Sequence, residues 1–192
     1  GTASITDTFD VVIANTNDAP TLATAQADET ATEDTAYSVD VSGNFADVDV
    51  GDTLTYTATG MPSTMTMSTA GVLSGTPLNA DVGTYTVVVT ATDGTASITD
   101  TFDVVIANTN DLTTGTVTVT GDAYDDEVLT AVTTALADDD GMGTFTYQWA
   151  NQDGDITGAT SSTYTIGSCC TVLGDTYTVT VVHTDATSVA QT

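Results

Sequence analysis

The 192-residue chain contains no lysine and no arginine, and it carries 27 acidic side chains against a single histidine. Its formal net charge is −27 at pH 7. Such a chain cannot neutralise phosphates, which excludes nucleic acid as a partner, and anionic membrane surfaces repel it, so we expect no direct membrane insertion. The carboxylates must therefore be hydrated, hydrogen-bonded to the backbone, or neutralised by bound cations.

Cysteine and aromatic residues are also scarce. The only two cysteines are adjacent, Cys169 and Cys170, a spacing that suggests neither a zinc site nor a framework of internal disulfides. Buried thiols, a ring formed by the two neighbours, and a disulfide to another chain all stay open for this pair. Aromatic residues make up 6% of the chain, so any core must be thin and built on valine, isoleucine and tyrosine.

The chain does contain a verbatim internal repeat. The residues GTASITDTFDVVIANTND occur at 1–18 and again at 94–111. This spacing is too long for a helical repeat and fits one β domain of about 100 residues. The sequence predicts a closing strand and linker at 1–18, a complete unit at 19–111, and a different unit at 112–192 that stops before a full last strand. A segment of a longer tandem array and a subunit with a loose first strand are both compatible with this arrangement.

Apolar residues alternate with threonine over long stretches, which predicts β-strands with one buried face. The stretch GTYTVVVTATDG at 83–94 alternates in this way, and so does the repeated stretch at 94–107. Clusters of Gly, Asn and Asp separate such runs, so we expect an all-β fold of antiparallel sandwiches. We expect the aspartates of the repeated strand to be solvated: Asp7, Asp10, Asp100 and Asp103.

Longer motifs resemble a known class of bacterial modules. In 19–111 the pieces GVLSGTP, DVGTYTV, ATDG and NTND follow in the order seen in the cadherin-like and immunoglobulin-like (Ig-like) repeats of giant secreted bacterial surface adhesins of the RTX type. Residues 112–166 are similar to another Ig-like module of these proteins, through ADDDGMGTFTYQW at 137–149. The resemblance implies tandem Ig-like or cadherin-like β-sandwiches in an extracellular, cell-surface protein.

Cadherin-type modules bind Ca²⁺ at their junctions, so the resemblance also implies calcium sites. Calcium takes about six to eight oxygen ligands, which cadherins supply from an Asp-x-Asn-Asp linker, an Asp-x-Asp loop and an aspartate after the sixth strand. The matching residues of the first junction are Asn15, Asn17, Asp18, Asp47, Asp49, Asp52 and Asp93. Those of the second are Asn108, Asn110, Asp111, Asp138, Asp140 and Asp185, while Glu33 and Asp81 match acidic positions of the first unit that face the second junction.

The chain departs from the cadherin pattern in two ways. The linker begins with Asn instead of Asp, and the acidic-Arg-Glu triplet of cadherins is absent. We therefore expect fewer calcium ions per junction than in a true cadherin. For any single aspartate, a solvated turn carboxylate is the simpler interpretation, because Asp is a common turn residue.

These features predict a structural or adhesive repeat protein that forms a calcium-rigidified rod or surface filament of a bacterium, with copies of itself as partners. Two alternatives stay open: residues 1–14 could complete the last sandwich of the next subunit by strand addition, or a unit could bind cell-surface glycans or proteins. We do not expect an enzyme, because nothing places an acid or a nucleophile beside His183, which we expect to be a half-buried core residue. Trp149, the single tryptophan, is expected in the core.

Overall fold

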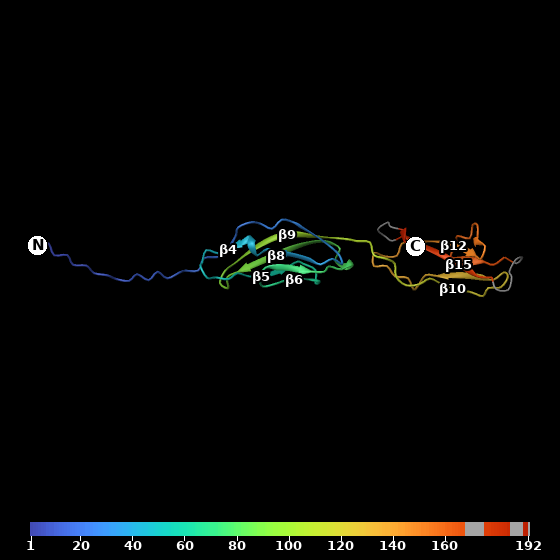
Figure 1. The fold of residues 1–192 in the computed structure, drawn as a ribbon, viewed down its shortest axis with the longest axis horizontal. Coiled ribbons are helices and arrows are strands. Elements are labelled where there is room, and N and C mark those ends of the chain that lie inside the picture. Colours follow the sequence, from blue (N-terminus) through green and yellow to red (C-terminus); the bar gives the residue numbers. More distant parts are fainter. Residues whose placement is uncertain (168–174, 185–189, 192) are drawn as a thin grey trace. The chain divides into compact units, whose positions relative to one another are not determined.

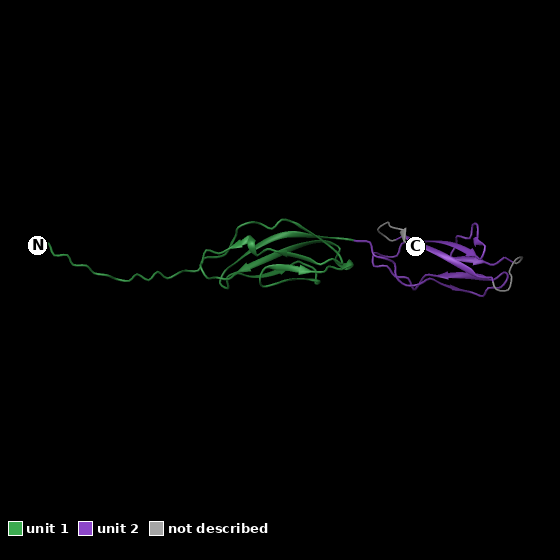
Figure 2. Ribbon diagram, viewed as in Figure 1, with its two compact units in different colours: residues 1–108 green, residues 109–192 purple. Residues whose placement is uncertain are grey.

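A computed structural model describes residues 1–167, 175–184 and 190–191 (Figure 1). The chain divides into unit 1, Gly1–Asn108, and unit 2, Thr109–Thr192 (Figure 2). Apart from two short 3-10 helices at Ser42–Asn44 and Asn79–Asp81, the regular structure of the described residues is β. None of their helices is long and apolar enough to cross a membrane. The predictions for Cys169, Cys170 and Asp185 concern residues outside the described ranges.

Unit 1 is built from two facing sheets and a short strand pair. One sheet has the order β2-β9-β8-β5, the second has the order β3-β7-β6, and β1 pairs with β4. The bounds are β1 Thr21–Leu22, β2 Glu29–Thr32, β3 Tyr37–Asp40, β4 Phe45–Ala46, β5 Thr55–Thr59, β6 Met65–Met67, β7 Val72–Gly75, β8 Gly83–Thr92 and β9 Ser97–Ala107. The alternating stretches of the sequence thus form the strands that they predict.

The alternation decides which side chains enter the core of unit 1. On β8, Val87, Val89 and Ala91 are buried, while Val88 and Thr90 between them are half-buried. On β9, Phe102, Val104 and Ile106 are buried in the same way. The two strands pair over ten residues, from Gly83 opposite Ile106 to Thr92 opposite Ser97. This long ladder forms the centre of the larger sheet.

One strand pair differs from the expected antiparallel arrangement. Strand β2 runs parallel to β9, with Glu29 opposite Val104 and Thr32 opposite Ala107. The chain first pairs β1 with β4 and then crosses to the edge of the larger sheet, where it runs in the same direction as the closing strand. Periodicity within a strand carries no information on the direction of its neighbour, so the sequence alone did not reveal this pair.

Unit 2 has the same two-sheet plan with shorter strands. Its sheets have the orders β10-β11-β14 and β13-β12-β15-β16. The bounds are β10 Thr118–Thr120, β11 Val128–Val132, β12 Thr144–Asn151, β13 Gly154–Asp155, β14 Thr163–Thr165, β15 Tyr177–Thr184 and β16 Ala190–Gln191. Its core contains the buried residues Leu129, Ala131, Trp149 and Ile166. Trp149 is fully buried and its indole N–H donates to the carbonyl oxygen of Ser161 at 2.9 Å, which confirms its expected core position.

Residues 1–14 form neither strand nor helix in this structure. They are extended, and every one of them is exposed. Residues 94–107 have the same sequence and supply β9. The same fourteen residues therefore occur once within a sheet and once without a partner strand among the described residues.

Candidate cation-binding loops

In unit 1, the linker is attached to the loop after β4 by one buried carboxylate. Asp49 is only 8% exposed. Its Oδ2 accepts a hydrogen bond from the backbone N–H of Asp18 at 2.7 Å, and its Oδ1 accepts one from the side-chain amide of Asn15, also at 2.7 Å. Hydrogen bonds to a charged acceptor are stronger than neutral ones. Asp49 therefore holds two linker residues at once.

The loop itself is shaped by a second carboxylate. Asp47 Oδ1 accepts from the backbone N–H of Asp49 at 2.9 Å, a local turn that aspartate commonly stabilises. The other oxygen, Asp47 Oδ2, is buried and has no hydrogen-bond partner within the described part of the chain. A buried carboxylate oxygen without a partner is costly, because it has lost its hydration without compensation.

A third acidic residue completes this cluster. One carboxylate oxygen from each of Asp47, Asp49 and Asp52 lies within 4.8 Å of the others. Calcium–oxygen distances are about 2.3–2.6 Å, so two ligands on opposite sides of one ion lie about 5 Å apart. The spacing of these oxygens, together with the unpaired Asp47 Oδ2, fits a hard divalent cation held by oxygen ligands.

Asp93, at the turn between β8 and β9, is attached to the same linker. Its Oδ2 accepts from the side-chain amide of Asn17 at 3.0 Å. Its Oδ1 accepts from the backbone N–H groups of Thr95 and Ala96, at 2.6 and 2.7 Å. The backbone hydrogen bonds from Ala96 and Thr95, followed by the bond from Asn17, lower the pKa of Asp93, so this carboxylate stays ionised well into the acid range.

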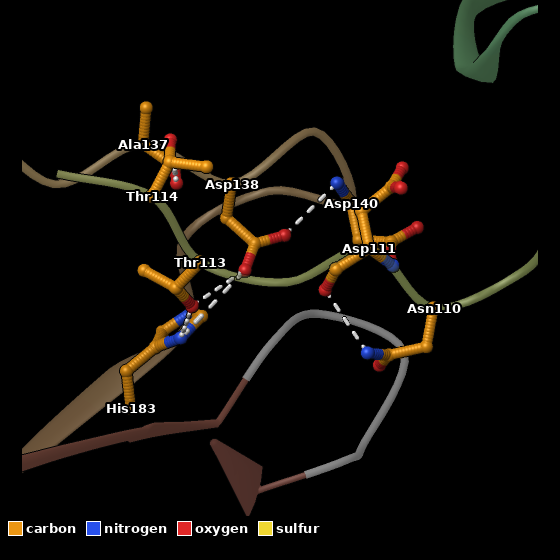
Figure 3. A network of polar contacts seen from close by, with 8 residues as sticks. All are labelled: Asn110, Asp111, Thr113, Thr114, Ala137, Asp138, Asp140 and His183. Atoms are coloured by element: carbon orange, nitrogen blue, oxygen red, sulfur yellow. Dashed lines mark hydrogen bonds and ion pairs between the residues drawn. The ribbon is translucent and has the colours of Figure 1, made fainter. Parts of the chain in front are cut away.

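Unit 2 repeats the arrangement with different surrounding sequence (Figure 3). The backbone N–H of Asp111 donates to Asp140 Oδ2 at 2.6 Å, and the backbone N–H of Asp140 donates to Asp138 Oδ1 at 3.0 Å. These contacts correspond one for one to the Asp18–Asp49 and Asp49–Asp47 contacts of unit 1. The linker amide of Asn110 donates to the carbonyl oxygen of Asp111 at 3.0 Å, as that of Asn17 does to Asp18 at 2.9 Å.

The backbone explains why two dissimilar sandwiches form the same contacts. Three residues after the linker aspartate, the chain pairs with the residue just before the Asp-x-Asp loop. In unit 1 the pair is Thr21 with Ala46, and in unit 2 it is the isolated bridge of Thr114 with Ala137. This short antiparallel pairing brings the linker N–H groups beside the loop carboxylates.

The first aspartate of each loop differs in what its second carboxylate oxygen contacts. In unit 2, Asp138 Oδ2 accepts from the Thr113 hydroxyl at 2.8 Å, and Nδ1 of His183 lies 2.9 Å from the same hydroxyl and 3.8 Å from Asp138 Oδ2 (Figure 3). The corresponding oxygen in unit 1, Asp47 Oδ2, is the one without a partner. Sequence reasoning missed Thr113. The signal was its place two residues after the linker aspartate, where unit 1 has Pro20.

His183 is more deeply buried than expected. It is 3% exposed instead of half-buried, and its ring lies 5.6 Å from that of Phe145. Its place in the strand register explains the difference, since it is paired opposite Phe145 near the end of the long β12–β15 ladder.

Of the remaining predicted ligands, Asp81 and Asp18 make other contacts. Glu33 is fully buried in unit 1, and its backbone N–H donates to the carbonyl of Ala107. Asp81 Oδ2 accepts from the Leu78 N–H at 3.0 Å and from the Thr64 hydroxyl at 2.6 Å, and these bonds lower the pKa of Asp81. Asp18 offers its amide, not its carboxylate, to the loop. Asn108 is exposed at the end of unit 1.

The prediction that the strand aspartates are all solvated was wrong for Asp100. This residue is only 7% exposed, and its carboxylate accepts from the backbone N–H of Gln26 at 2.7 Å and of Thr101 at 2.9 Å. Asp100 has the same parity as Phe102 and Val104, so it faces the core. The two backbone donors replace its lost hydration.

Comparison with known proteins agrees with the sandwich fold of unit 1. A family described as "Putative Ig domain" matches residues 19–107. No curated protein matches the chain.

The solved structures that are similar to this chain include three proteins of different kinds. An endo-fucoidan hydrolase of glycoside hydrolase family 107 is 20% identical over 90% of this chain and 27% of its own, with a TM-score of 0.39. A SusE-like surface-located polysaccharide-binding protein from Bacteroides thetaiotaomicron is 18% identical over 90% of this chain and 33% of its own, with a TM-score of 0.40. The titin domains Z1Z2, solved with telethonin, are 12% identical over 90% of this chain and 92% of their own, with a TM-score of 0.38.

This chain thus spans about a third or less of the first two solved chains. At these identities the likeness does not extend to activity, ligand or partner. The family match and the sheet order show that residues 19–107 form an immunoglobulin-like domain within an all-β chain.

Proposed function

We propose that this chain is a structural segment of an extracellular bacterial surface or adhesive protein, in which bound Ca²⁺ fixes the linkers to the sandwiches. The observation that carries the proposal is the repeated amide–carboxylate contact, Asp18 to Asp49 and Asp111 to Asp140, beside an Asp-x-Asp loop in each unit. A cation bound at such a loop would fix the loop carboxylates in place while the linker stays attached through its backbone.

The charge of the chain supports a cation as the ligand. With a net charge of −27 and no lysine or arginine, His183, beside Asp138, is the one basic side chain in the sequence that could neutralise a loop carboxylate. In unit 1 the residues that would hold the ion are Asp47, Asp49 and Asp52. Extracellular calcium modules typically bind with dissociation constants of about 10⁻⁴–10⁻³ M, and we expect affinity in that range.

The two units should differ in affinity. Asp47 Oδ2 is free to coordinate an ion, whereas Asp138 Oδ2 already accepts a hydrogen bond from Thr113. An ion at the unit 2 loop would have to compete with that bond. We therefore expect unit 1 to bind calcium more tightly than unit 2.

A glycan-binding role has less support. Trp149, the only tryptophan, is fully buried and cannot stack on a sugar. An open hollow lies along residues 156–165, but its one aromatic side chain, Tyr164, packs against the Trp149 ring at 5.9 Å.

The test is calcium titration of the full chain by calorimetry, with thermal unfolding in calcium and in chelator at low salt. Bound ligand stabilises a fold according to its concentration relative to the dissociation constant, so calcium should raise the unit 1 transition more than magnesium at equal ionic strength. Asp47→Asn keeps the oxygen that accepts from Asp49 and replaces the free one, and it should remove this difference. Asp40→Asn, the same charge change at an exposed turn that accepts from Ser42 N–H, is the control and should behave like the parent chain.

Two results would contradict the proposal. The first is equal stabilisation by calcium and magnesium, which would indicate screening alone. The second is an equal response of the Asp47→Asn and Asp40→Asn variants, which would place the ion elsewhere.

A further inference from the structure

We propose that the hydroxyl of Thr113, positioned by His183, fixes the linker of unit 2 to its loop without a bound cation. Together with Asp138 these residues form the hydroxyl network, and all three belong to unit 2. The network itself does not depend on calcium. The difference that we expect between the two units in their response to calcium rests on the proposed function.

The hydrogen-bonding capacity of each group determines the direction of the bonds in the network. The Thr113 hydroxyl donates to Asp138 Oδ2 at 2.8 Å and lies 2.9 Å from Nδ1 of His183 (Figure 3). A hydroxyl has one hydrogen to donate, and an ionised carboxylate only accepts. Because the hydrogen of Thr113 goes to Asp138, its oxygen must accept a hydrogen carried by Nδ1. His183 thus orients the hydroxyl toward the carboxylate.

The hydroxyl network lies in the interior of unit 2. The side chains of Asp138 and His183 are 0% and 3% exposed. Burial of a carboxylate is costly unless its oxygens are hydrogen-bonded. Both oxygens of Asp138 meet this condition, because Oδ1 accepts from the backbone N–H of Asp140 and Oδ2 accepts from Thr113. Unit 2 therefore satisfies this buried carboxylate with groups of its own chain.

The network also attaches the linker to the loop at a second point. The first point is the backbone N–H of Asp111, which donates to Asp140 Oδ2 at 2.6 Å. Thr113 follows two residues later and holds Asp138, the first aspartate of the same loop. The linker of unit 2 thus contacts both aspartates of its Asp-x-Asp loop, one through the main chain and one through a side chain.

Unit 1 has no hydroxyl at the corresponding position. Two residues after its linker aspartate it has Pro20, which is buried. Proline has neither a side-chain donor nor a backbone N–H. In agreement with this difference, Asp47 Oδ2 is buried and has no hydrogen-bond partner within the described ranges. The contact that Thr113 supplies to the first loop aspartate in unit 2 is therefore the one that the proposed ion would supply in unit 1.

The residue that positions the hydroxyl differs between the units as well. The stretches TYTVVVTATD at 84–93 and TYTVTVVHTD at 176–185 align without a gap, and Ala91 of the first corresponds to His183 of the second. Ala91 is fully buried and has no side-chain donor. The two differences thus occur as a pair, with a hydroxyl and an imidazole in unit 2 and two apolar residues in unit 1.

The hydroxyl network should make the unit 2 linker insensitive to calcium. An ion bound at Asp138 Oδ2 would have to displace the Thr113 hydroxyl. It would also meet Nδ1 of His183, which lies 3.8 Å from Asp138 Oδ2 and presents a hydrogen instead of a lone pair. The imidazole therefore cannot serve as a ligand through this nitrogen, and the site favours the hydroxyl over a cation.

The first test examines the parent chain without any substitution. His183 is the only histidine, so nitrogen NMR spectra of the isotope-labelled full chain contain a single imidazole. The network requires that Nδ1 carries a hydrogen. An imidazole with its hydrogen on Nε2 alone would overturn the proposal.

The second test compares Thr113→Val and Thr113→Ser with the parent chain in the presence of a chelator. Valine keeps the shape of threonine and removes the hydroxyl, whereas serine keeps the hydroxyl. Hydrogen exchange at the Asp111 amide should be at least tenfold faster in Thr113→Val than in the parent chain, and Thr113→Ser should behave like the parent chain. Equal exchange in all three chains, or equal acceleration in both variants, would overturn the proposal.

Addition of calcium to the parent chain separates this inference from the proposed function. Calcium should slow exchange of the Asp18 amide in unit 1 and leave that of the Asp111 amide in unit 2 unchanged. If calcium slows exchange at both amides, the inference fails and the proposed function stands. If calcium slows neither, while Thr113→Val still accelerates exchange in chelator, the proposed function fails and fixation of the unit 2 linker by the hydroxyl network stands.

Discussion

At the residue scale, the backbone amide takes the place that lysine and arginine have in most proteins. Asp49, Asp93, Asp100 and Asp140 all accept hydrogen bonds from main-chain N–H groups. A carboxylate held in this way is stabilised in its charged form. For Asp93, the backbone hydrogen bonds lower the pKa of the carboxyl group, so the fold favours its ionised form.

Substitution of Asp81 measures how much the stability of the fold depends on an ionised carboxylate. Hydrogen bonds from the Leu78 N–H and the Thr64 hydroxyl lower its pKa in the folded state below the usual 3.8. A lowered folded-state pKa adds stability above the unfolded pKa, and this stability is lost as the pH falls through the folded pKa. Asp81→Asn should therefore melt a few degrees below the parent chain at pH 6, and the difference should shrink as the pH falls below about 4.

Thermal unfolding followed by circular dichroism between pH 2 and pH 6 would make this comparison. Asp10→Asn is the control for the loss of one charge, because Asp10 lies in the exposed segment 1–14. The parent chain and both variants are measured at the same low protein concentration. A constant difference between Asp81→Asn and the parent chain at every pH would show that the Asp81 hydrogen bonds do not depend on its ionisation.

At the element scale, the duplicated stretch shows one sequence in two different structural surroundings. The fourteen residues at 94–107 include the closing strand β9, whereas the same residues at 1–14 form no strand and are exposed. β-Propensity is identical in the two copies, so the difference must come from the neighbouring strands and the core. The second copy follows directly after β8, with which it forms a hairpin.

Alanine substitution at Phe102 and at its sequence counterpart Phe9 measures how much packing in the core contributes to the stability of unit 1. Phe102→Ala removes a ring that is 3% exposed and should lower the free energy of unfolding of unit 1 by about 3–5 kcal/mol. Phe9→Ala makes the same change in the same local sequence and should leave that free energy unchanged, because Phe9 is 83% exposed. Urea unfolding of the two variants at low concentration is the measurement, and equal effects would mean that residues 1–14 pack against unit 1 in solution.

The strands themselves could be predicted from alternation, and the buried sides of β8 and β9 follow from parity alone. Parity also placed Asp100 on the core face, but the usual preference of aspartate for solvent led to the opposite expectation. The residues that meet around Asp49 could be anticipated from resemblance to cadherin-like repeats. The Thr113–Asp138 contact was not anticipated: the position of Thr113 two residues after the linker aspartate is a signal, but it does not identify a partner 25 residues later.

At the scale of the whole molecule, the charge has one sign. In most proteins added salt weakens attractive ion pairs as well as repulsion, so its net effect is mixed. Here the only side chain that can form a positive partner is His183, so screening acts almost entirely on repulsion.

Both units should therefore become more stable as sodium chloride rises from about 10 mM to about 150 mM, which shortens the Debye length from about 30 to about 8 Å. Each kcal/mol of relieved repulsion should raise a melting temperature by about 4–8 °C for domains of this size. Differential scanning calorimetry in chelator measures this effect without calcium. A melting temperature that is flat or falls over this range would indicate that the carboxylates are already neutralised by protonation or by retained ions.

The amide–carboxylate contact at each linker has a consequence for how such chains can change over evolutionary time. Two sandwiches of different sequence bind the same NTND peptide through its main chain, which every amino-acid sequence possesses. A gene segment that encodes one sandwich can therefore be duplicated, deleted or replaced by another, because any sandwich with an Asp-x-Asp loop at this position can form the same linker contact.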